Sequence, residues 1–141
     1  MKYSPEKGYA GFWKRLTAGM IDLILIFLFS GIFSLMYGIA AQIIGINIDP
    51  FIYFKETNML MGILYVNGLL ISHQATIGMS FMCIRLTDIS GNPTSAGEVI
   101  VRYFAQIFLS SILGIGYFMI GWTKKKQALH DKIATTLVVN K

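Results

Sequence analysis

Three long apolar runs without a charged side chain dominate the pattern of this chain. They extend over Leu23–Ile48, Thr57–Ile84 and Tyr103–Thr123, which are 26, 28 and 21 residues long. A helix rises about 1.5 Å per residue and the hydrocarbon core of a bilayer is about 30 Å thick, so each run is long enough to cross a membrane. The runs hold 75 of the 141 residues, whereas about a quarter of the residues in a soluble domain are charged. The pattern predicts one integral membrane domain.

The runs divide the chain into consecutive segments. In the first segment, before the first run, the hydroxyl cap and the proline of Ser4-Pro5 predict the start of a short helix. The connection between the first two runs contains Asp49-Pro50, expected to end the first span, and then Lys55 and Glu56 in a loop. The segments are an interfacial piece (1–15), a first span (16–48), a second span (57–78), a strand and turn (79–93), a third apolar segment (95–123) and a cytoplasmic tail (124–141).

Two short β-strands are predicted outside the membrane. Side chains alternate from Phe81 to Asp88 before a turn at 90–93, and the stretch Ile133–Val139 is rich in β-branched residues. Each strand must find a partner for its backbone groups, so we expect the two to pair. Between them, Ser95 and Glu98 have the spacing of a capping box that opens a helix.

The distribution of basic residues sets the expected topology. They gather at the two ends of the chain, and the first connection holds Lys55 alone. The positive-inside tendency therefore places both termini in the cytoplasm. Three full crossings would put the tail outside, so we predict that the third run is a re-entrant hairpin, broken at Gly114 to Gly116, whose Tyr103–Leu113 arm descends about 16 Å. A plain third span is the alternative, because the run also matches the bilayer thickness.

The expected fold class is thus an all-α membrane protein with two transmembrane helices, a third apolar segment and a small cytoplasmic two-strand element. The net charge of +5 lies mainly at the ends and shows no base-reading or phosphate-reading pattern, so nucleic acid is not expected as a partner. Cys83 is the single cysteine, which excludes an internal disulfide. No metal-ligand spacing and no nucleophile-base set is evident, so we expect no metal, no cofactor and no enzyme.

Asp22 is the most informative residue, because it places a carboxylate inside an apolar stretch. Burying it costs about 2.5 to 3.5 kcal/mol on insertion scales, so such residues are kept where they have a partner or a function. Arg15, Ala18, Gly19 and Asp22 lie on one helical face. Gly31, Gly38 and Gly45 recur on the opposite side and suggest a packing seam.

Other polar residues in or beside the apolar runs are candidates for support of this site. Asn67 and Gln74 share a face of the second span, with His73 adjacent, and polar groups in lipid are more often interhelical hydrogen-bond partners than ligands. Arg102 precedes the third run, and His130 lies next to Asp131 in the tail.

Several ordered motifs resemble the RDD family of bacterial membrane proteins. They are Gly11 to Asp22, Gln74 to Gly78 with Ile84 to Asp88 and Gly91, the single Arg102, and Gln127 to Val139. The resemblance implies that Arg15, Asp22 and Asp131 are the arginine and aspartates for which the family is named. Met79-Ser80 departs from it, since the family often has a basic residue after the glycine. The family's role is largely undefined, although transport has been proposed and cation/proton exchange suggested for a member.

Two functions of different class follow. With both ends cytoplasmic, Arg15 and Asp131 can form an ion pair, and Asp22 lies about 10 Å deeper. The first function is transport of a small solute, cation or proton through a buried carboxylate, in a multi-pass protein of the bacterial plasma membrane. The second is a membrane scaffold or accessory subunit in which the three residues form a clamp. The expected partners are the lipid bilayer and a second copy or another membrane protein.

Overall fold

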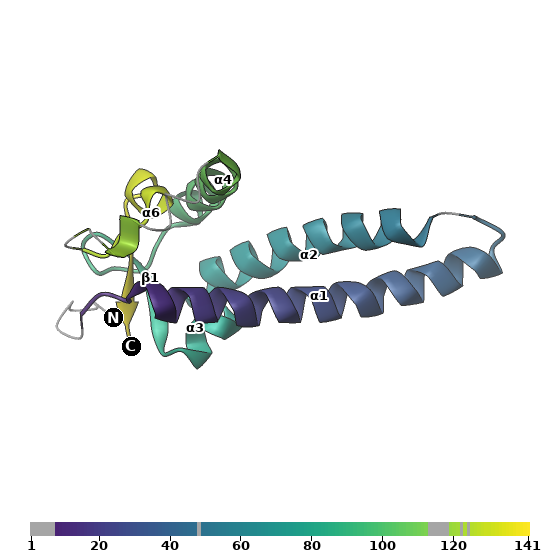
Figure 1. The fold of residues 1–141 in the computed structure, drawn as a ribbon, viewed down its shortest axis with the longest axis horizontal. Helices are drawn as coiled ribbons and strands as arrows, with labels where there is room; N and C mark the ends of the chain where they lie inside the picture. Colours follow the sequence, from purple (N-terminus) through teal and green to yellow (C-terminus); the bar gives the residue numbers. More distant parts are fainter. Residues whose placement is uncertain (1–7, 48, 113–118, 122, 124) are drawn as a thin grey trace.

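The computed structural model describes residues 8–47, 49–112, 119–121, 123 and 125–141 (Figure 1). The described part is mostly helical and carries one two-stranded antiparallel sheet. Its elements are, in chain order, α1 (Phe12–Ile43), α2 (Pro50–His73), α3 (Ile77–Phe81), β1 (Ile84–Asp88), α4 (Ala96–Ile112), α6 (Leu129–Ile133) and β2 (Thr136–Asn140).

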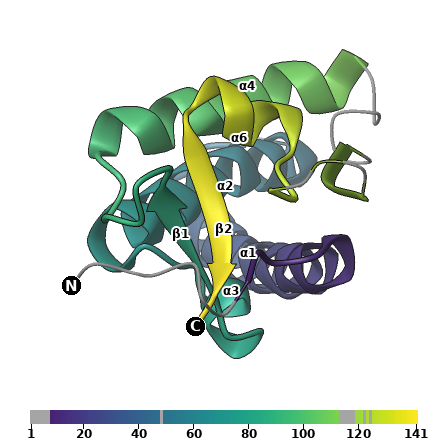
Figure 2. The ribbon, with the colours of Figure 1, turned by 90° about the vertical axis from the view of Figure 1, so that its left-hand side faces the viewer.

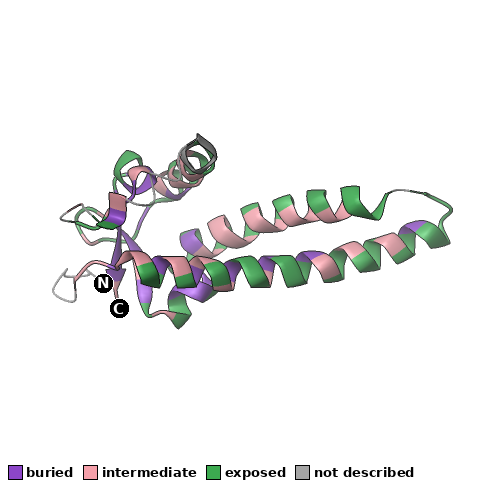
Figure 3. Cartoon of the chain, in the orientation of Figure 1, coloured by how far each residue is buried: buried purple, intermediate pink, exposed green. Residues whose placement is uncertain are grey.

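The helices α1 and α2 form a long antiparallel hairpin that extends away from the rest of the chain (Figure 1). Among the described helices, α1 alone is long and apolar enough to cross a membrane by length and composition. Its large apolar side chains point outward, as at Leu23, Phe27 and Leu35, and Figure 3 shows exposed residues along much of the hairpin. Soluble proteins rarely expose an apolar surface of this extent, so the surface fits a membrane protein.

The turn between α1 and α2 differs from the predicted loop. Asp49 and Pro50 begin α2 instead of only ending the first span, since the Asp49 carboxylate accepts a hydrogen bond from the Phe51 amide at 2.8 Å. An Asp-Pro pair both stops one helix and caps the next, because proline suits a first helical turn. Lys55 and Glu56, expected in the loop, therefore lie within α2.

Aromatic pairs, and not glycines, join the two long helices. Tyr37 packs edge-on against Tyr53 with ring centroids 4.4 Å apart, and Phe27 packs against Phe54 at 4.9 Å. At the predicted glycine seam, a Cβ on Gly31 would only touch Phe54 at 4.0 Å, and Gly38 and Gly45 have no such neighbour within 4 Å. No close helix contact covers this seam in the described chain.

The small sheet closes the open end of the hairpin. As predicted, β1 and β2 pair, in an antiparallel register from Ile84 opposite Asn140 to Asp88 opposite Thr136. The start of the chain joins them: Tyr9 bridges to Val139, and the Ala10 amide donates to the Val138 carbonyl at 2.9 Å. The helix predicted from Ser4 falls mostly outside the described residues, and residues 8–10 are not helical. Residues 8–10 thus lie beside β2 at this end of the hairpin (Figures 1 and 2).

The helix α4 begins at the predicted capping box and lies across the hairpin. The Ser95 amide donates to the Glu98 carboxylate at 2.7 Å, and the Glu98 amide donates to the Ser95 hydroxyl at 3.3 Å. Figure 1 shows α4 end-on, whereas Figure 2 shows it lengthwise over the ends of α1 and α2. Over Ala96–Ile112 the helix α4 therefore crosses the direction of α1, and the re-entrant hairpin and the third span stay predictions. The break predicted at Gly114 to Gly116 lies outside the described residues.

Candidate functional site

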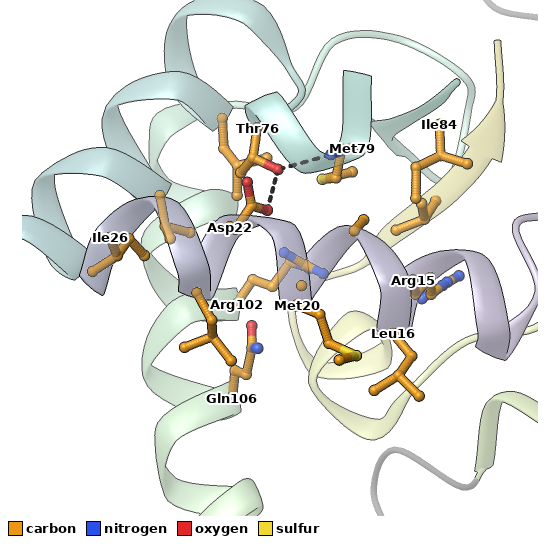
Figure 4. Close-up of a pocket in the computed structure, with 16 residues that line it drawn as sticks. Arg15, Leu16, Met20, Asp22, Ile26, Thr76, Met79, Ile84, Arg102 and Gln106 are labelled. Atoms are coloured by element: carbon orange, nitrogen blue, oxygen red, sulfur yellow. Dashed lines mark hydrogen bonds between the residues drawn. The ribbon is translucent and has the colours of Figure 1, made fainter. Parts of the chain in front are cut away.

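Asp22 lies about two turns beyond Arg15 on α1 and is held by neutral donors from two other elements. One carboxylate oxygen accepts from the Tyr65 hydroxyl at 2.7 Å and the Gly78 amide at 2.8 Å, and the other accepts from the Thr76 hydroxyl at 2.6 Å (Figure 4). The residue is 8% exposed. Among the described residues no Lys, Arg or His side chain lies within ion-pair distance of it. The burial expected at Asp22 is therefore present, and Arg15 does not pair with this carboxylate.

The close approach of α3 to α1 depends on a glycine. A Cβ added to Gly78 would lie 2.1 Å from the Ala18 carbonyl oxygen and 2.9 Å from the Asp22 carboxylate. Thr76 caps the same helix, because its hydroxyl accepts from the Met79 amide at 3.2 Å while donating to Asp22. Local capping chemistry and a missing side chain together bring α3 onto the carboxylate.

Arg15 instead points to the tail, where it meets Asp131. Its Nη1 donates to one oxygen of the Asp131 carboxylate, and Arg102 Nε donates to the other at 2.9 Å. Arg15 also donates to two backbone carbonyls, those of Ala10 at 3.1 Å and Lys126 at 2.6 Å. The predicted ion pair between Arg15 and Asp131 is confirmed, and Arg102 extends it to α4. The cluster joins α1, α4 and α6 around one fully buried carboxylate.

The electrostatics of this cluster follow from burial and from the two arginines. Burial by itself raises the pKa of the Asp131 carboxyl, but the charges of Arg102 and Arg15 outweigh it and hold that pKa well below its usual value. Burial, with Arg102 adding to it, lowers the pKa of His130 to about 4. The imidazole is thus neutral near neutral pH, and the cluster carries two positive charges against one negative charge.

The remaining predicted residues do not join Asp22. Gln74 ends α2 with φ of 58°. Its side-chain oxygen accepts a hydrogen bond from the Thr94 backbone amide at 2.7 Å, and its side-chain nitrogen donates to the Thr94 backbone carbonyl at 3.1 Å. Asn67 donates to the Ile63 carbonyl of its own helix at 2.9 Å, and His73 is exposed at the end of α2. These contacts support the fold. The structure therefore brings Arg15, Arg102, His130 and Asp131 together and leaves Asp22 as a separate centre.

A pocket of about 330 Å³ opens beside both centres. Its volume is at the low end of the range for small-molecule sites. Figure 4 shows that α1 provides one wall and that Arg102 and Gln106 extend from α4. Apolar side chains complete the lining. Its polar residues are Arg15, Asp22, Thr76, Arg102 and Gln106. In the described ranges no group of three or more His, Cys, Asp or Glu residues is arranged to hold a metal ion.

Three contributors to this site were not predicted from the sequence. Tyr65 and Gln106 were not singled out, and Thr76 was quoted only within a motif. A threonine directly before a short helix is a recognisable cap, so Thr76 could have been found. Tyr65 and Gln106 had no comparable local signal, because only the tertiary packing of α2 and α4 against α1 brings them to the pocket.

The chain is similar to proteins of a known family. The sequence model described as the RDD family matches residues 9–135, which include both aspartates and both arginines. A Bacillus subtilis (strain 168) protein, "Uncharacterized protein YxaI", is 31% identical over 148 residues, covering 94% of this chain and 97% of its own length. No solved structure matches the chain.

Proposed function

Because the chain belongs to the RDD family, we propose that it is an integral membrane protein that binds a small solute, cation or proton at Asp22 and moves it across the bacterial plasma membrane. The observation that carries this proposal is a buried carboxylate without a cationic partner among the described residues, at the wall of a pocket. Ionisable residues held at membrane depth are by default functional.

The hydrogen bonds at Asp22 leave room for one more donor. A carboxylate has about four acceptor sites, and protein donors fill three of them. The oxygen bonded to Thr76 has only that one partner in the described chain. A cation or proton that reaches this oxygen would neutralise a charge that its neutral neighbours leave uncompensated.

The arrangement of helices supports a membrane position for this site. We place α1 and α2 across the bilayer as a hairpin, with the sheet, α6 and both termini on the cytoplasmic side. The exposed Lys14, Lys125, Lys126 and Lys132 lie at that end, in keeping with the positive-inside tendency. The helix α4 then lies along the membrane surface, with the exposed apolar side chains of Phe104 and Phe108 toward lipid.

Flux through proteoliposomes tests the transport proposal. Purified protein is reconstituted and assayed across a panel of monovalent cations with an imposed pH gradient. We expect flux from the wild type and its loss in Asp22→Asn. Asp49→Asn is the matched control, since Asp49 is an exposed helix cap at which asparagine serves equally well. Unchanged flux in a folded Asp22→Asn variant would exclude this role of the carboxylate.

A second function, a membrane scaffold or accessory subunit, is favoured by a different observation. Asp22 ties α1 to α2 and α3, and Asp131 ties α6 to α1 and α4, so both carboxylates also fix the geometry of the fold. Under this proposal the chain assembles with copies of itself or with another membrane protein. Asp22→Asn would then reduce assembly, measured by cross-linking in membranes, while wild-type proteoliposomes show no flux of any tested solute.

A further inference from the structure

We propose that the pocket beside Asp22 binds a zwitterion that carries a primary ammonium and an anionic group, namely the headgroup of an aminophospholipid such as phosphatidylethanolamine. This inference rests on the proposed function only in using Asp22 as a binding group. Two features of the pocket carry it, both on the same lining: an arginine whose terminal nitrogens have no hydrogen-bond partner among the described residues, and a carboxylate with no cationic side chain beside it among them.

Arg102 is the first of these features. Its side chain is 11% exposed, and in the described part of the chain Nε is its only nitrogen with a hydrogen bond, to Asp131. The two terminal nitrogens carry four N–H donors. A guanidinium this far buried is costly unless its donors are used, and its planar fork matches phosphate and carboxylate groups. The pocket that Arg102 lines therefore suits an anionic group (Figure 4).

Asp22 supplies the opposite charge on the same pocket. Its carboxylate has a spare acceptor site, which a primary ammonium can fill by donating a hydrogen bond. The charged residues that line the pocket are Arg15, Arg102 and Asp22, and together with Asp131, to which both arginines are bonded, their charges sum to zero. A zwitterion can pair with the carboxylate and with the guanidinium at the same time, and it leaves this sum unchanged.

The rim of the pocket favours a lipid over a water-soluble zwitterion. Met20 and Leu23 of α1 line the pocket and are 56% and 67% exposed, on the apolar surface that the hairpin presents outward. The pocket is thus open toward the same face as the exposed apolar side chains of α1. With a volume of about 330 Å³ it has room for a headgroup, and the acyl chains would lie along the α1 surface outside.

Native mass spectrometry of the purified protein in detergent tests the inference. The probes are phosphatidylethanolamine, phosphatidylcholine and phosphatidylglycerol with identical acyl chains, and soluble phosphoethanolamine as competitor. We expect the wild type to retain the ethanolamine lipid about tenfold better than the other two, the effect of about one charge-assisted hydrogen bond. Choline is a quaternary ammonium without an N–H, and glycerol has no cation, so neither can donate this bond to Asp22.

Variants then separate the two ends of the site. Asp22→Asn should lose the preference for the ethanolamine lipid over the glycerol lipid. Arg102→Lys should weaken the binding of all three lipids, because lysine lacks the guanidinium fork. Asp49→Asn should bind the three lipids as the wild type does. Equal retention of the three lipids by the wild type, or an unchanged preference in Asp22→Asn, would overturn the proposal. Full displacement of the lipid by equimolar phosphoethanolamine would contradict the proposal that the bound headgroup belongs to a lipid. Lipid retention is measured in detergent without a gradient, so the failure of the flux assay and the failure of lipid binding can be told apart.

Discussion

The side chains of Arg15 and Asp131 form a buried ion pair although they lie 116 positions apart in the sequence. The pair fixes the start of α1 to α6, and Arg102 attaches α4 to the same carboxylate at 2.9 Å. The residues near the two ends of the chain are therefore held in one cluster at one end of the helical hairpin (Figure 2). This relationship makes the C-terminal tail a structural part of the domain.

Arg15→Gln should destabilise the protein strongly, because it leaves Asp131 buried with one arginine and frees two backbone carbonyls. Removing one partner of a buried pair costs about 3 to 5 kcal/mol. The free energy of unfolding, measured by denaturant titration in detergent, checks this. Lys14→Gln is the matched control, since Lys14 is exposed and bonds only Asn140 at 2.9 Å in the described structure. A loss in Lys14→Gln as large as in Arg15→Gln would contradict the clamp.

His130 should make stability fall between pH 6.5 and about 4. The folded state lowers the pKa of this imidazole from 6.5 to about 4, so in this window the unfolded chain binds a proton that the folded chain does not. The contribution of neutral His130 to the free energy of unfolding is complete above pH 6.5 and is lost as the pH falls to about 4. Its size is about 3 kcal/mol.

Unfolding free energies across this pH range, for the wild type and His130→Gln, provide the measurement. The variant should show a flatter profile, and His73→Gln, which removes an exposed imidazole, should follow the wild type. Asp131 does not account for the same window, because its lowered pKa keeps its contribution complete above the ordinary value of 3.8 and loses it only at lower pH. A profile that is the same in His130→Gln and the wild type would refute the assignment.

Gly78→Ala should separate α3 from α1, because the added Cβ would lie 2.1 Å from the Ala18 carbonyl oxygen. Overpacking of this kind costs about 1 to 3 kcal/mol. Thermal unfolding in detergent should show a lower midpoint. Gly68→Ala is the control: no atom lies within 4 Å of a Cβ there, so the change should be neutral or stabilise α2 by about 0.5 to 1 kcal/mol. An unaffected midpoint in Gly78→Ala would mean that α3 does not hold this contact.

Spin labels on α4 should report a helix at the membrane surface. In a Cys83→Ser background, which removes the exposed native thiol, cysteines are placed at Phe108 and at Gly97. In liposomes, we expect the label at 108 to collide more with lipid-soluble oxygen and the label at 97 more with a water-soluble nickel complex. Equal exposure of the Phe108 label to the nickel complex and to oxygen would show that this face does not meet lipid.

Part of the fold could be predicted because its signals are local. The pattern at Ser95 and Glu98 specifies a capping box. Both strands could be recognised from their own residues, without knowledge of the strand that each pairs with. The ion pair of Arg15 with Asp131 was predictable once both ends were assigned to one side of the membrane. The short helices α3 and α6 were not predicted, since five residues give too little periodicity.

The surroundings of Asp22 could not be predicted in the same way. The sequence alone showed that a carboxylate lies within an apolar stretch, because length, hydropathy and charge are properties of the chain. Only the tertiary structure decided that neutral donors from Tyr65, Thr76 and Gly78 hold it while Arg15 turns to Asp131. The choice depends on which surfaces approach each other, and hydrogen bonds act over about 3 Å, so a helix moved by one turn would exchange every partner.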